Sequence, residues 1–472
     1  MKQSIPGYQD EDAKSINKNK IAEYASYASW NLNNWDKFQD YVKQIEGKET
    51  YEKYFFQSVI NIENNQYKEA ERLIDRCREM LDPRMKSLMG ESYRRAYPCI
   101  LEMQYLKELE EIIEYKKIDD EDKRMHLKDL WSFRLEFMAQ DVESMQKTLN
   151  IRSLVIDISE DTNHYVKLAD LCSKKGNTAM CERILQNLKT EITNKVSIYP
   201  KEQCFNVSKI NFGLLKSKYS QGQHMEAMEG LIKLIDKEKR IDPIWYITLG
   251  KWNRDIAERE NTLNNDEFKK IIAYFQQATE IDEKDNLAWH YYALANYEAS
   301  KFLEGGYIGR KGTANYEEYI TYVVFAVKGL IQSISLGEQD VTKTLQDTLR
   351  LLKLWFKHGS VVEIDKLIRN GFDIIGIEVW TQVIPQLLAR IDINAERTKN
   401  TMVELLKIIC DTYPQTMIYP VSVLSQSNTV SRKQVAHELI EMMRRNQKTL
   451  INQALFISKE LIRAAVLLTE SW

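Results

Sequence analysis

Apolar residues recur three and four positions apart along most of this chain, from about residue 21 onward. In one early stretch, Phe55, Phe56, Val59 and Ile60 fall on one side of a helix. Such spacing is typical of amphipathic α-helices, because a helix turns once in about 3.6 residues. Few stretches alternate apolar and polar residues as half-buried strands do. The pattern therefore predicts an all-α protein.

Residues 64–83 carry a more specific helical pattern. Small polar residues at a turn precede Tyr67, Ala70 and Ile74, and Pro83 is expected to close the helix. A small alanine on the apolar face permits close contact between helices, as in the second half of a tetratricopeptide-type hairpin. We expect two antiparallel helices in this region.

Similar half-hairpins recur at irregular intervals, each with a turn before apolar residues at helical spacing: residues 174–188, 221–236 and 278–299. The first two segments have their turns at Gly176 and Gly222, and the third places Ala288 and Ala293 on one helical face. Because the period is not constant, these are degenerate repeats. They predict stacked helical hairpins, which form an α-solenoid.

The second half of the chain has longer apolar helices joined at prolines. Residues 345–359 place Leu349, Leu352 and Phe356 on one stripe, and Gly359 has the position of a C-cap. Pro385 indicates a helix that kinks or restarts, and residues 413–420, YPQTMIYP, are expected to end one helix and begin another. Such helices resemble HEAT-type repeats.

These patterns predict four segments, in chain order: 1–20, a polar N-terminal tail; 21–300, tetratricopeptide-like repeats; 301–317, a Gly-rich linker; and 318–460, HEAT-like repeats.

Composition excludes several classes of protein. The chain has 472 residues, of which 43% are hydrophobic and 29% charged, with a net charge of −3, so bulk charge gives no reason to expect nucleic-acid binding. The six cysteines form no CxxC pair and are typical of buried thiols in a reducing compartment. No apolar run approaches the roughly 20 residues that span a bilayer, and no signal peptide is visible. By default we expect a cytosolic or nuclear protein, and we assign it to the cytoplasm.

Motifs for catalysis are missing from the sequence. It contains no HRD or DFG kinase motif, and the glycines of residues 305–313 do not form a P-loop, because Lys311 is followed by Gly312. We interpret that segment as a connection. The histidines form no metal-binding pair, and His290, like Cys172 and Cys181, is expected to be a packed structural residue. The sequence predicts that this chain is not an enzyme.

Two charged stretches have alternative interpretations. Residues 107–115, KELEEIIEY, have the pattern of a solvated helix face. Residues 90–97, GESYRRAY, could be an anion site, a surface ion pair, a family marker or, from their helical geometry, a structural joint. Helical spacing favours the joint: Tyr93 and Tyr97 would pack between hairpins, while an arginine such as Arg94 pairs with Glu91.

One basic cluster could bind an anion. Lys167 and Lys174 are seven residues apart and share a helical face, and Lys175 follows at a turn. Convergent lysines can hold a polyanion, whose charge offsets their mutual repulsion. Separately solvated lysines fit the same spacing.

Nine ordered blocks of sequence resemble the FAT domain of the target-of-rapamycin (TOR) kinases, in the phosphatidylinositol-3-kinase-related kinase family. They include GESYRRAY, KELEEIIEYK, NIRSLVI, AWHYYALANYEA, VWTQVIPQLLARID and SKELIRAAVLLTESW. The resemblance implies tetratricopeptide-like repeats followed by HEAT-like repeats, clamped around a serine/threonine kinase domain. It also implies that residues 461–472 open the first helix of the rapamycin-binding (FRB) domain.

The same resemblance implies an inositol hexakisphosphate site for which Lys167 and Lys174 match the family's basic positions. The other aligned positions are Gln140, Ile244, Thr248 and Leu287, which cannot neutralise phosphate. No cofactor is required by this interpretation.

Two functions are therefore predicted. The first is a regulatory FAT scaffold whose partners are the kinase and FRB domains of the same polypeptide and the subunits of a TOR complex. The second is a free-standing helical-repeat adaptor that binds protein partners or peptides in a concave groove.

Overall fold

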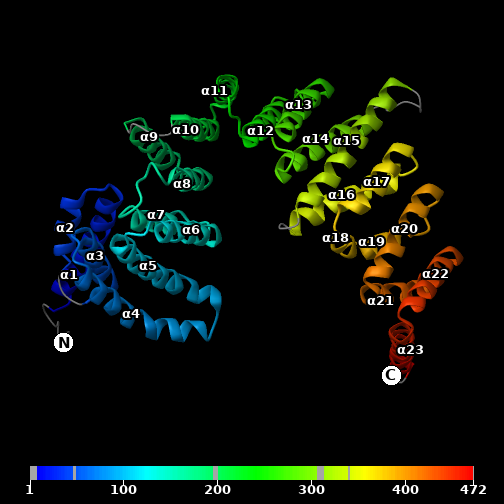
Figure 1. The fold of residues 1–472 in the computed structure, drawn as a ribbon, viewed down its shortest axis with the longest axis horizontal. Helices are drawn as coiled ribbons and strands as arrows, with labels where there is room; N and C mark the ends of the chain where they lie inside the picture. Colours follow the sequence, from blue (N-terminus) through cyan, green and yellow to red (C-terminus); the bar gives the residue numbers. More distant parts are fainter. Residues whose placement is uncertain (1–7, 46–48, 195–199, 306–312, 338–340, 471–472) are drawn as a thin grey trace, which may run out of the picture. The chain divides into compact units, whose positions relative to one another are not determined.

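The computed structural model describes residues 8–45, 49–194, 200–305, 313–337 and 341–470. Within these residues the regular elements are α-helices, and no strand is found (Figure 1). This confirms the all-α prediction. The chain divides into two compact units, Met1–Ala227 (unit 1) and Met228–Trp472 (unit 2).

Unit 1 is built from the first ten helices: α1 Tyr8–Asn31, α2 Trp35–Lys43, α3 Tyr51–Glu63, α4 Tyr67–Met89, α5 Tyr93–Lys117, α6 Glu121–Phe137, α7 Val142–Arg152, α8 Thr162–Lys174, α9 Thr178–Asn194 and α10 Pro200–Ser220. Helix α11, His224–Lys237, crosses the division between the units.

Unit 2 is built from the remaining twelve: α12 Pro243–Arg259, α13 Asn265–Ile281, α14 Asn286–Gly305, α15 Ala314–Leu336, α16 Val341–His358, α17 Val362–Ile374, α18 Ile377–Thr381, α19 Ile384–Ala389, α20 Glu396–Thr412, α21 Pro414–Ser425, α22 Val430–Asn446 and α23 Lys448–Glu470.

Short turns join the helices of unit 1 into packed pairs. Helix α3 packs on α4, and α8 packs on α9, each pair joined by three residues that are not helical. The turn before α9 contains Gly176 at φ +82°, and the turn before α11 contains Gly222 at φ +92°. Glycine adopts this left-handed conformation without a Cβ clash. The predicted turns at both glycines are confirmed.

In unit 2, small residues make one especially close helix contact. A Cβ added at Gly329 of α15 would lie 2.9 Å from the Cβ of Ala293 on α14, nearer than unbonded Cβ atoms approach. This contact uses the alanine that the repeat pattern predicted to permit close packing.

Helix α15 is long and apolar enough to span a membrane by length and composition, which corrects the expectation that no such run exists. It is a core helix, since 67% of that apolar window is buried.

The hydrophobic core of unit 2 continues across the predicted linker. Ala293 and Tyr297 of α14 share one buried cluster with Tyr319 of α15 and with residues as far as Ile451. Residues 301–305 end α14 and residues 314–317 begin α15. The predicted linker, 301–317, therefore includes helical residues at both of its ends, and residues 306–312 lie outside the described part. The bounds of the two repeat types stay predictions.

The two chain ends also contain more helix than predicted. Residues 8–20 of the predicted tail belong to α1, and residues 1–7 lie outside the described part. The helix expected to start near residue 461 already begins at Lys448, as α23. Whether residues 461–472 belong to an FRB domain stays a prediction.

Proline marks two of the predicted helix joints. Pro385 lies in the first turn of α19, which follows α18 after a short break, and α21 begins at Pro414 after α20 ends at Thr412. Proline fits the first turn, where the backbone N–H has no helical partner. Pro83, in contrast, lies inside α4, which runs on to Met89, so the prediction that it closes the helix is wrong.

The stretch GESYRRAY is the joint between α4 and α5. The turn 90–92 separates the two helices, and Arg95, rather than Arg94, pairs with Glu91 at 2.7 Å. The hydroxyl of Tyr97 accepts a hydrogen bond from the N–H of Ala139 at 2.9 Å, which ties α5 to the end of α6. Tyr93 is 71% exposed, so the prediction that both tyrosines pack between hairpins fails for it.

Candidate functional site

The predicted lysines lie on helix α8, and both are accessible from solvent. Asn163, Lys167, Asp170 and Lys174 are spaced by four, three and four residues, which places them along one face of the helix. Among the described residues, neither Lys167 nor Lys174 forms an ion pair or a side-chain hydrogen bond. Two ammonium groups on this face therefore have no carboxylate bonded to them within the described residues.

Helix α10 contributes two more lysines to this face. Lys216 donates to both carboxylate oxygens of Asp170 at 2.7 and 2.8 Å, and Lys209 donates to the side-chain oxygen of Asn163 at 3.0 Å. Lys175 turns away and pairs with Asp141 at 2.8 Å. The structure thus groups four lysines around α8 and α10, with Asp170 as the carboxylate between them. We call this set, Lys167, Lys174, Lys209 and Lys216, the α8–α10 lysine face.

The other aligned positions do not add to this face. Gln140 lies before α7 and is exposed. Ile244, Thr248 and Leu287 belong to unit 2, where the hydroxyl of Thr248 donates to the backbone oxygen of Ile244 at 2.7 Å. None of these four side chains carries a positive charge.

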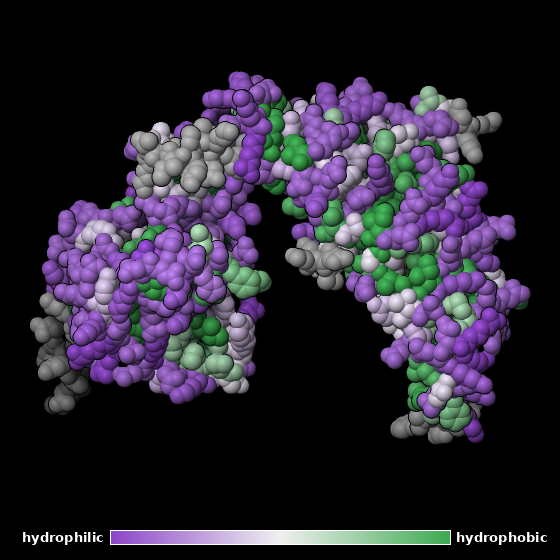
Figure 2. Space-filling view, viewed as in Figure 1, coloured by the Kyte–Doolittle hydropathy of each residue, from purple (hydrophilic) through white to green (hydrophobic). Residues whose placement is uncertain are grey.

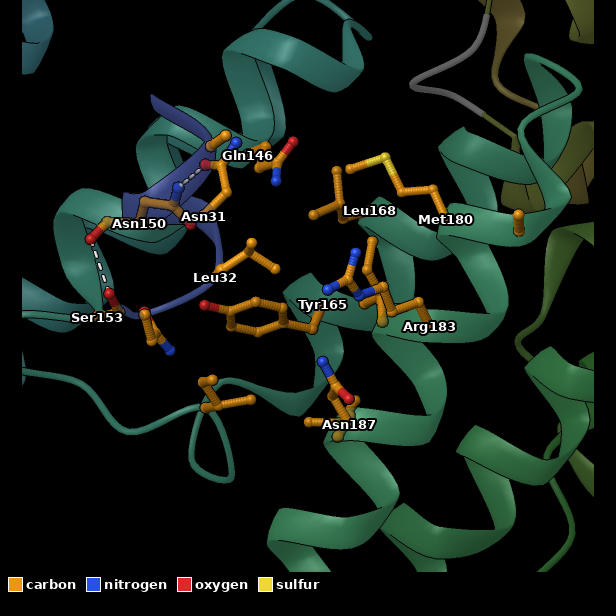
Figure 3. A pocket seen from close by; sticks show the side chains of 16 residues that line it. Asn31, Leu32, Gln146, Asn150, Ser153, Tyr165, Leu168, Met180, Arg183 and Asn187 are labelled. Atoms are coloured by element: carbon orange, nitrogen blue, oxygen red, sulfur yellow. Dashed lines mark hydrogen bonds between the residues drawn. The ribbon is translucent and has the colours of Figure 1, made fainter. Parts of the chain in front are cut away.

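A cavity of about 680 Å³ opens in unit 1 among α1, α7, α8 and α9 (Figure 3). One wall carries amides from the end of α1 and from α7, and α9 forms the opposite wall, with Leu32, Tyr165 and Leu168 between them. The residues of the cavity are Ala28, Asn31, Leu32, Asn33, Gln146, Asn150, Ser153, Ile158, Tyr165, Leu168, Ala179, Met180, Arg183, Ile184, Asn187 and Leu188. Neither aspartate nor glutamate is among these residues.

Two polar groups of the cavity can bind a ligand. Burial raises the pKa of Tyr165 well above its usual range, and Asp161 adds to this effect, so the phenol stays neutral. Arg183 contributes a guanidinium group with five N–H donors. It forms no ion pair within the described residues, and Figure 3 shows its guanidinium directed from α9 toward the space beside Tyr165.

A shallower cavity of about 570 Å³ lies between α16 and α19 in unit 2. Leu352, Phe356 and Ile393 contribute apolar surface to its lining, and Lys353 and Arg390 contribute positive charge. Figure 2 shows apolar side chains at the surface over these helices. The predicted stripe of Leu349, Leu352 and Phe356 therefore lines this groove, although Leu349 is 41% exposed.

Buried ion pairs hold α5 against its neighbours, which corrects the prediction of a solvated acidic face. Glu108 is fully buried and accepts two hydrogen bonds from Arg152 of α7, both at 3.0 Å. Glu111, 4% exposed, accepts from Arg134 of α6 at 2.7 and 2.8 Å and from the indole N–H of Trp131 at 2.8 Å. Within residues 106–113, leucines and isoleucines occur on all sides of the helix, and this pattern was the sequence signal for its burial.

Lys147 of α7 is enclosed by aromatic rings. Its ammonium lies 4.4 Å from the ring centre of Phe55, 4.7 Å from that of Tyr105, 5.3 Å from that of Tyr27 and 5.8 Å from that of Tyr51. These rings come from α1, α3 and α5, so one side chain connects four helices. Burial lowers the pKa of Lys147 to about 8.

The remaining candidates are packed residues, as expected. His290 is 14% exposed, and its Nδ1 lies 2.7 Å from a carboxylate oxygen of Asp347. Cys172 and Cys181 are buried, and burial raises the pKa of the Cys181 thiol to about 11. No group of three or more His, Cys, Asp or Glu side chains that could hold a metal occurs among the described residues.

Comparison with known proteins identifies related sequences. A family model of the FAT domain matches residues 22–353, and a model of the HEAT repeats of ATR-like serine/threonine-protein kinases matches residues 363–460. The chain is 30% identical to serine/threonine-protein kinase mTor of Drosophila melanogaster, over 96% of this chain and 19% of that protein. It is also 30% identical to TOR2 of Saccharomyces cerevisiae, over 98% of this chain and 21% of that protein. The chain thus spans about a fifth of the length of the curated relatives it matches.

A solved structure shares the fold. The complete CtTel1 dimer with C2 symmetry contains a segment that matches with a TM-score of 0.61. The match covers 95% of this chain and 18% of that one, at 11% sequence identity.

Proposed function

This chain belongs to the FAT domain family, and we propose that it is the non-catalytic scaffold of a TOR-type serine/threonine protein kinase. In this role it clamps and regulates the kinase domain of the longer polypeptide, in the signalling of growth and nutrient state. The observation that carries the proposal is the FAT match over residues 22–353, together with similarity to TOR kinases along 96–98% of the chain. Phosphoryl transfer belongs to the kinase domain, so the chain by itself is not an enzyme.

The packing within each unit suits a scaffold. Stacked hairpins resist bending, because each helix buries its apolar face against its neighbours. In unit 1, Glu108 and Glu111 add charged contacts that hold α5 to α6 and α7. Such an array can restrain a bound kinase through contacts distributed along its length.

The test is the kinase activity of the full-length protein with one core residue of α16 truncated. Leu352 and Trp355 are 2% and 0% exposed, so Leu352→Ala or Trp355→Ala loosens the packing of this helix. We expect higher kinase activity, because a looser clamp restrains the kinase less. Exposed Lys353 on the same helix provides the control, Lys353→Ala. Unchanged activity of a measurably destabilised variant would count against the proposal.

As a second part of this function, we propose that the α8–α10 lysine face binds a polyanion such as inositol hexakisphosphate. Its support is that Lys167 and Lys174 share one exposed helix face, next to Lys209 and Lys216 of α10. The ammonium groups of Lys167 and Lys174, which form no ion pair among the described residues, provide positive charge that a phosphate cluster neutralises.

This part can be tested by calorimetric titration of the chain with inositol hexakisphosphate. We expect Lys167→Ala and Lys174→Ala each to weaken binding about tenfold, since each removes one charged contact. Lys86→Ala, on α4, removes a charge elsewhere in unit 1 and should leave binding unchanged. Binding that is equally insensitive to all three substitutions would place the ligand elsewhere.

The partners follow from the same proposal: the kinase and FRB domains in cis, and the subunits of a TOR complex in the cytoplasm. The alternative is a free-standing adaptor, which the tetratricopeptide-like hairpins of unit 1 favour. A reading frame that continues into FRB, HRD and DFG motifs would exclude the adaptor.

A further inference from the structure

We propose that the cavity of unit 1 binds an extended peptide segment that carries an acidic side chain. The cavity is a site of its own, since none of its residues belongs to the α8–α10 lysine face. At about 680 Å³ it lies within the range of about 300–1,000 Å³ that is usual for ligand pockets. Such a peptide site is compatible with a scaffold and with an adaptor alike.

Amide side chains line both long walls of the cavity. Gln146 and Asn150 on α7 face the space from one side, and Asn187 on α9 faces it from the other (Figure 3). An amide side chain offers the same donor and acceptor groups as a peptide bond, so it can hydrogen-bond a peptide backbone in both directions. Asn150 already donates to the side-chain oxygen of Asn31, which fixes its orientation, and no described residue donates to its own side-chain oxygen.

The spacing of these side chains matches an extended peptide. Gln146 and Asn150, and likewise Arg183 and Asn187, are four residues apart on their helices. Four residues advance a helix by about 6 Å, and two residues of an extended chain advance by about 6.6 Å. Successive polar groups on each wall can therefore meet every second residue of a strand that runs between α7 and α9.

The positive charge in the lining of the cavity determines which side chain the peptide must carry. Arg183 is the charged residue of the lining, and it has no carboxylate partner among the described residues. A carboxylate or phosphorylated side chain would form a charge-assisted, two-bonded contact with this guanidinium. The phenol of Tyr165, held neutral by burial, points to the side of the cavity away from Arg183 in Figure 3, where it can donate to a second acceptor of the peptide.

Apolar surface between the walls provides the remaining contact. Leu32, Leu168 and Met180 lie beside the polar groups in Figure 3. In an extended peptide successive side chains point to opposite sides, so an apolar residue next to the acidic one would pack against this surface. A methionine can adapt its shape to different partners.

The test uses the whole chain and a positional library of nine-residue peptides. At each position the fixed residue is glutamate, phosphoserine, glutamine or lysine, and binding is measured by fluorescence anisotropy. We expect selection for glutamate or phosphoserine at one position over glutamine and lysine. Arg183→Glu should weaken binding of the selected acidic pool tenfold to hundredfold, the usual range for a charge-assisted hydrogen bond, and should shift selection toward lysine.

Control variants separate the cavity from general surface charge. Lys189→Ala removes a positive charge from α9 outside the lining and should leave the selection unchanged. Asn187→Leu keeps Arg183 and should lower affinity for all pools alike, since it removes a backbone contact. Circular dichroism verifies the fold of each variant. Absence of any selected position, or selection that Arg183→Glu does not alter, would overturn the proposal.

Discussion

Arg152 and Glu108 form a buried, two-bonded ion pair between α7 and α5. The Nε and Nη2 of Arg152 donate to the two carboxylate oxygens of Glu108, each at 3.0 Å, and the side chains are 2% and 0% exposed. Both residues lie in blocks of sequence that resemble the FAT domain, NIRSLVI and KELEEIIEYK. The pair therefore gives these family blocks a physical role, which is to hold two helices of unit 1 together.

Arg152→Met is expected to destabilise unit 1 by about 3–5 kcal/mol, because it leaves the carboxylate of Glu108 buried without its partner. The double variant Glu108→Leu/Arg152→Met should recover most of this loss, since an apolar pair replaces the ion pair. Hydrogen–deuterium exchange of α5 and α7 measures the change locally. A double variant no more stable than Arg152→Met would show that the two side chains are not coupled.

Gly329→Ala is expected to destabilise unit 2, although alanine is the better helix former by about 1 kcal/mol. The added methyl would lie 2.9 Å from the Cβ and 3.1 Å from the Cα of Ala293, so α14 and α15 must separate. A loss of about 1–3 kcal/mol is typical of such overpacking. Gly305, where an added Cβ has no neighbour within 4 Å, supplies the control. Thermal unfolding followed by circular dichroism should rank Gly329→Ala below both Gly305→Ala and the unaltered chain.

The sequence was most informative where backbone geometry alone determines structure. Gly176 and Gly222 occupy turns with positive φ, and Pro385 and Pro414 lie in first helical turns, because few residue types fit those conformations. Pro83 is an exception, because it lies inside a helix and does not end it. Its helix continues because tertiary packing stabilises α4 on both sides of the proline: Cys77 and Leu81 are buried before it, and Met85 packs against the core of unit 1 after it.

The candidate site was predicted only in part. Lys167 and Lys174 could be identified because helical spacing brings residues of one segment together. The cavity could not, since Asn31, Asn150 and Arg183 come from three helices that no local pattern connects. The burial of Glu108 was missed for a similar reason: its partner, Arg152, is 44 residues away in the sequence.

Acid is expected to destabilise unit 2 through His358. Burial lowers the pKa of this imidazole to about 4, the positive charge of Lys357 acts in the same direction, and Glu304 opposes them. The hydroxyl of Tyr319 lies 3.0 Å from its Nε2. Between pH 6.5 and 4 the unfolded chain binds a proton at this residue that the folded chain does not, so the free energy of unfolding falls as pH falls.

We expect this loss to be about 1–2 kcal/mol, after allowance for solvent screening of a partly exposed group. Urea unfolding at about pH 7 and pH 4.5 measures it, with His358→Gln as the comparison. The variant should lose less stability than the unaltered chain over this interval. An identical loss in both would assign the acid sensitivity to other groups.

Alkali should act in the opposite direction through Lys147. Its pKa of about 8 lies below that of an unfolded lysine, so above pH 8 the unfolded chain holds a proton that the folded chain has released. The free energy of unfolding should therefore rise with pH between about 8 and 9.5, with a slope of at most about 1.4 kcal/mol per pH unit.

Lys147→Met retains the packed stem against Phe55 and Tyr105 and should abolish this slope, while it changes stability at pH 7 by less than about 1.5 kcal/mol. Lys147→Ala removes the stem too and should cost about 2–5 kcal/mol, as large-to-small core substitutions do. Urea unfolding of the three chains at about pH 7 and 9.5 distinguishes the two contributions, and a slope that persists in Lys147→Met would rule out this lysine as its source.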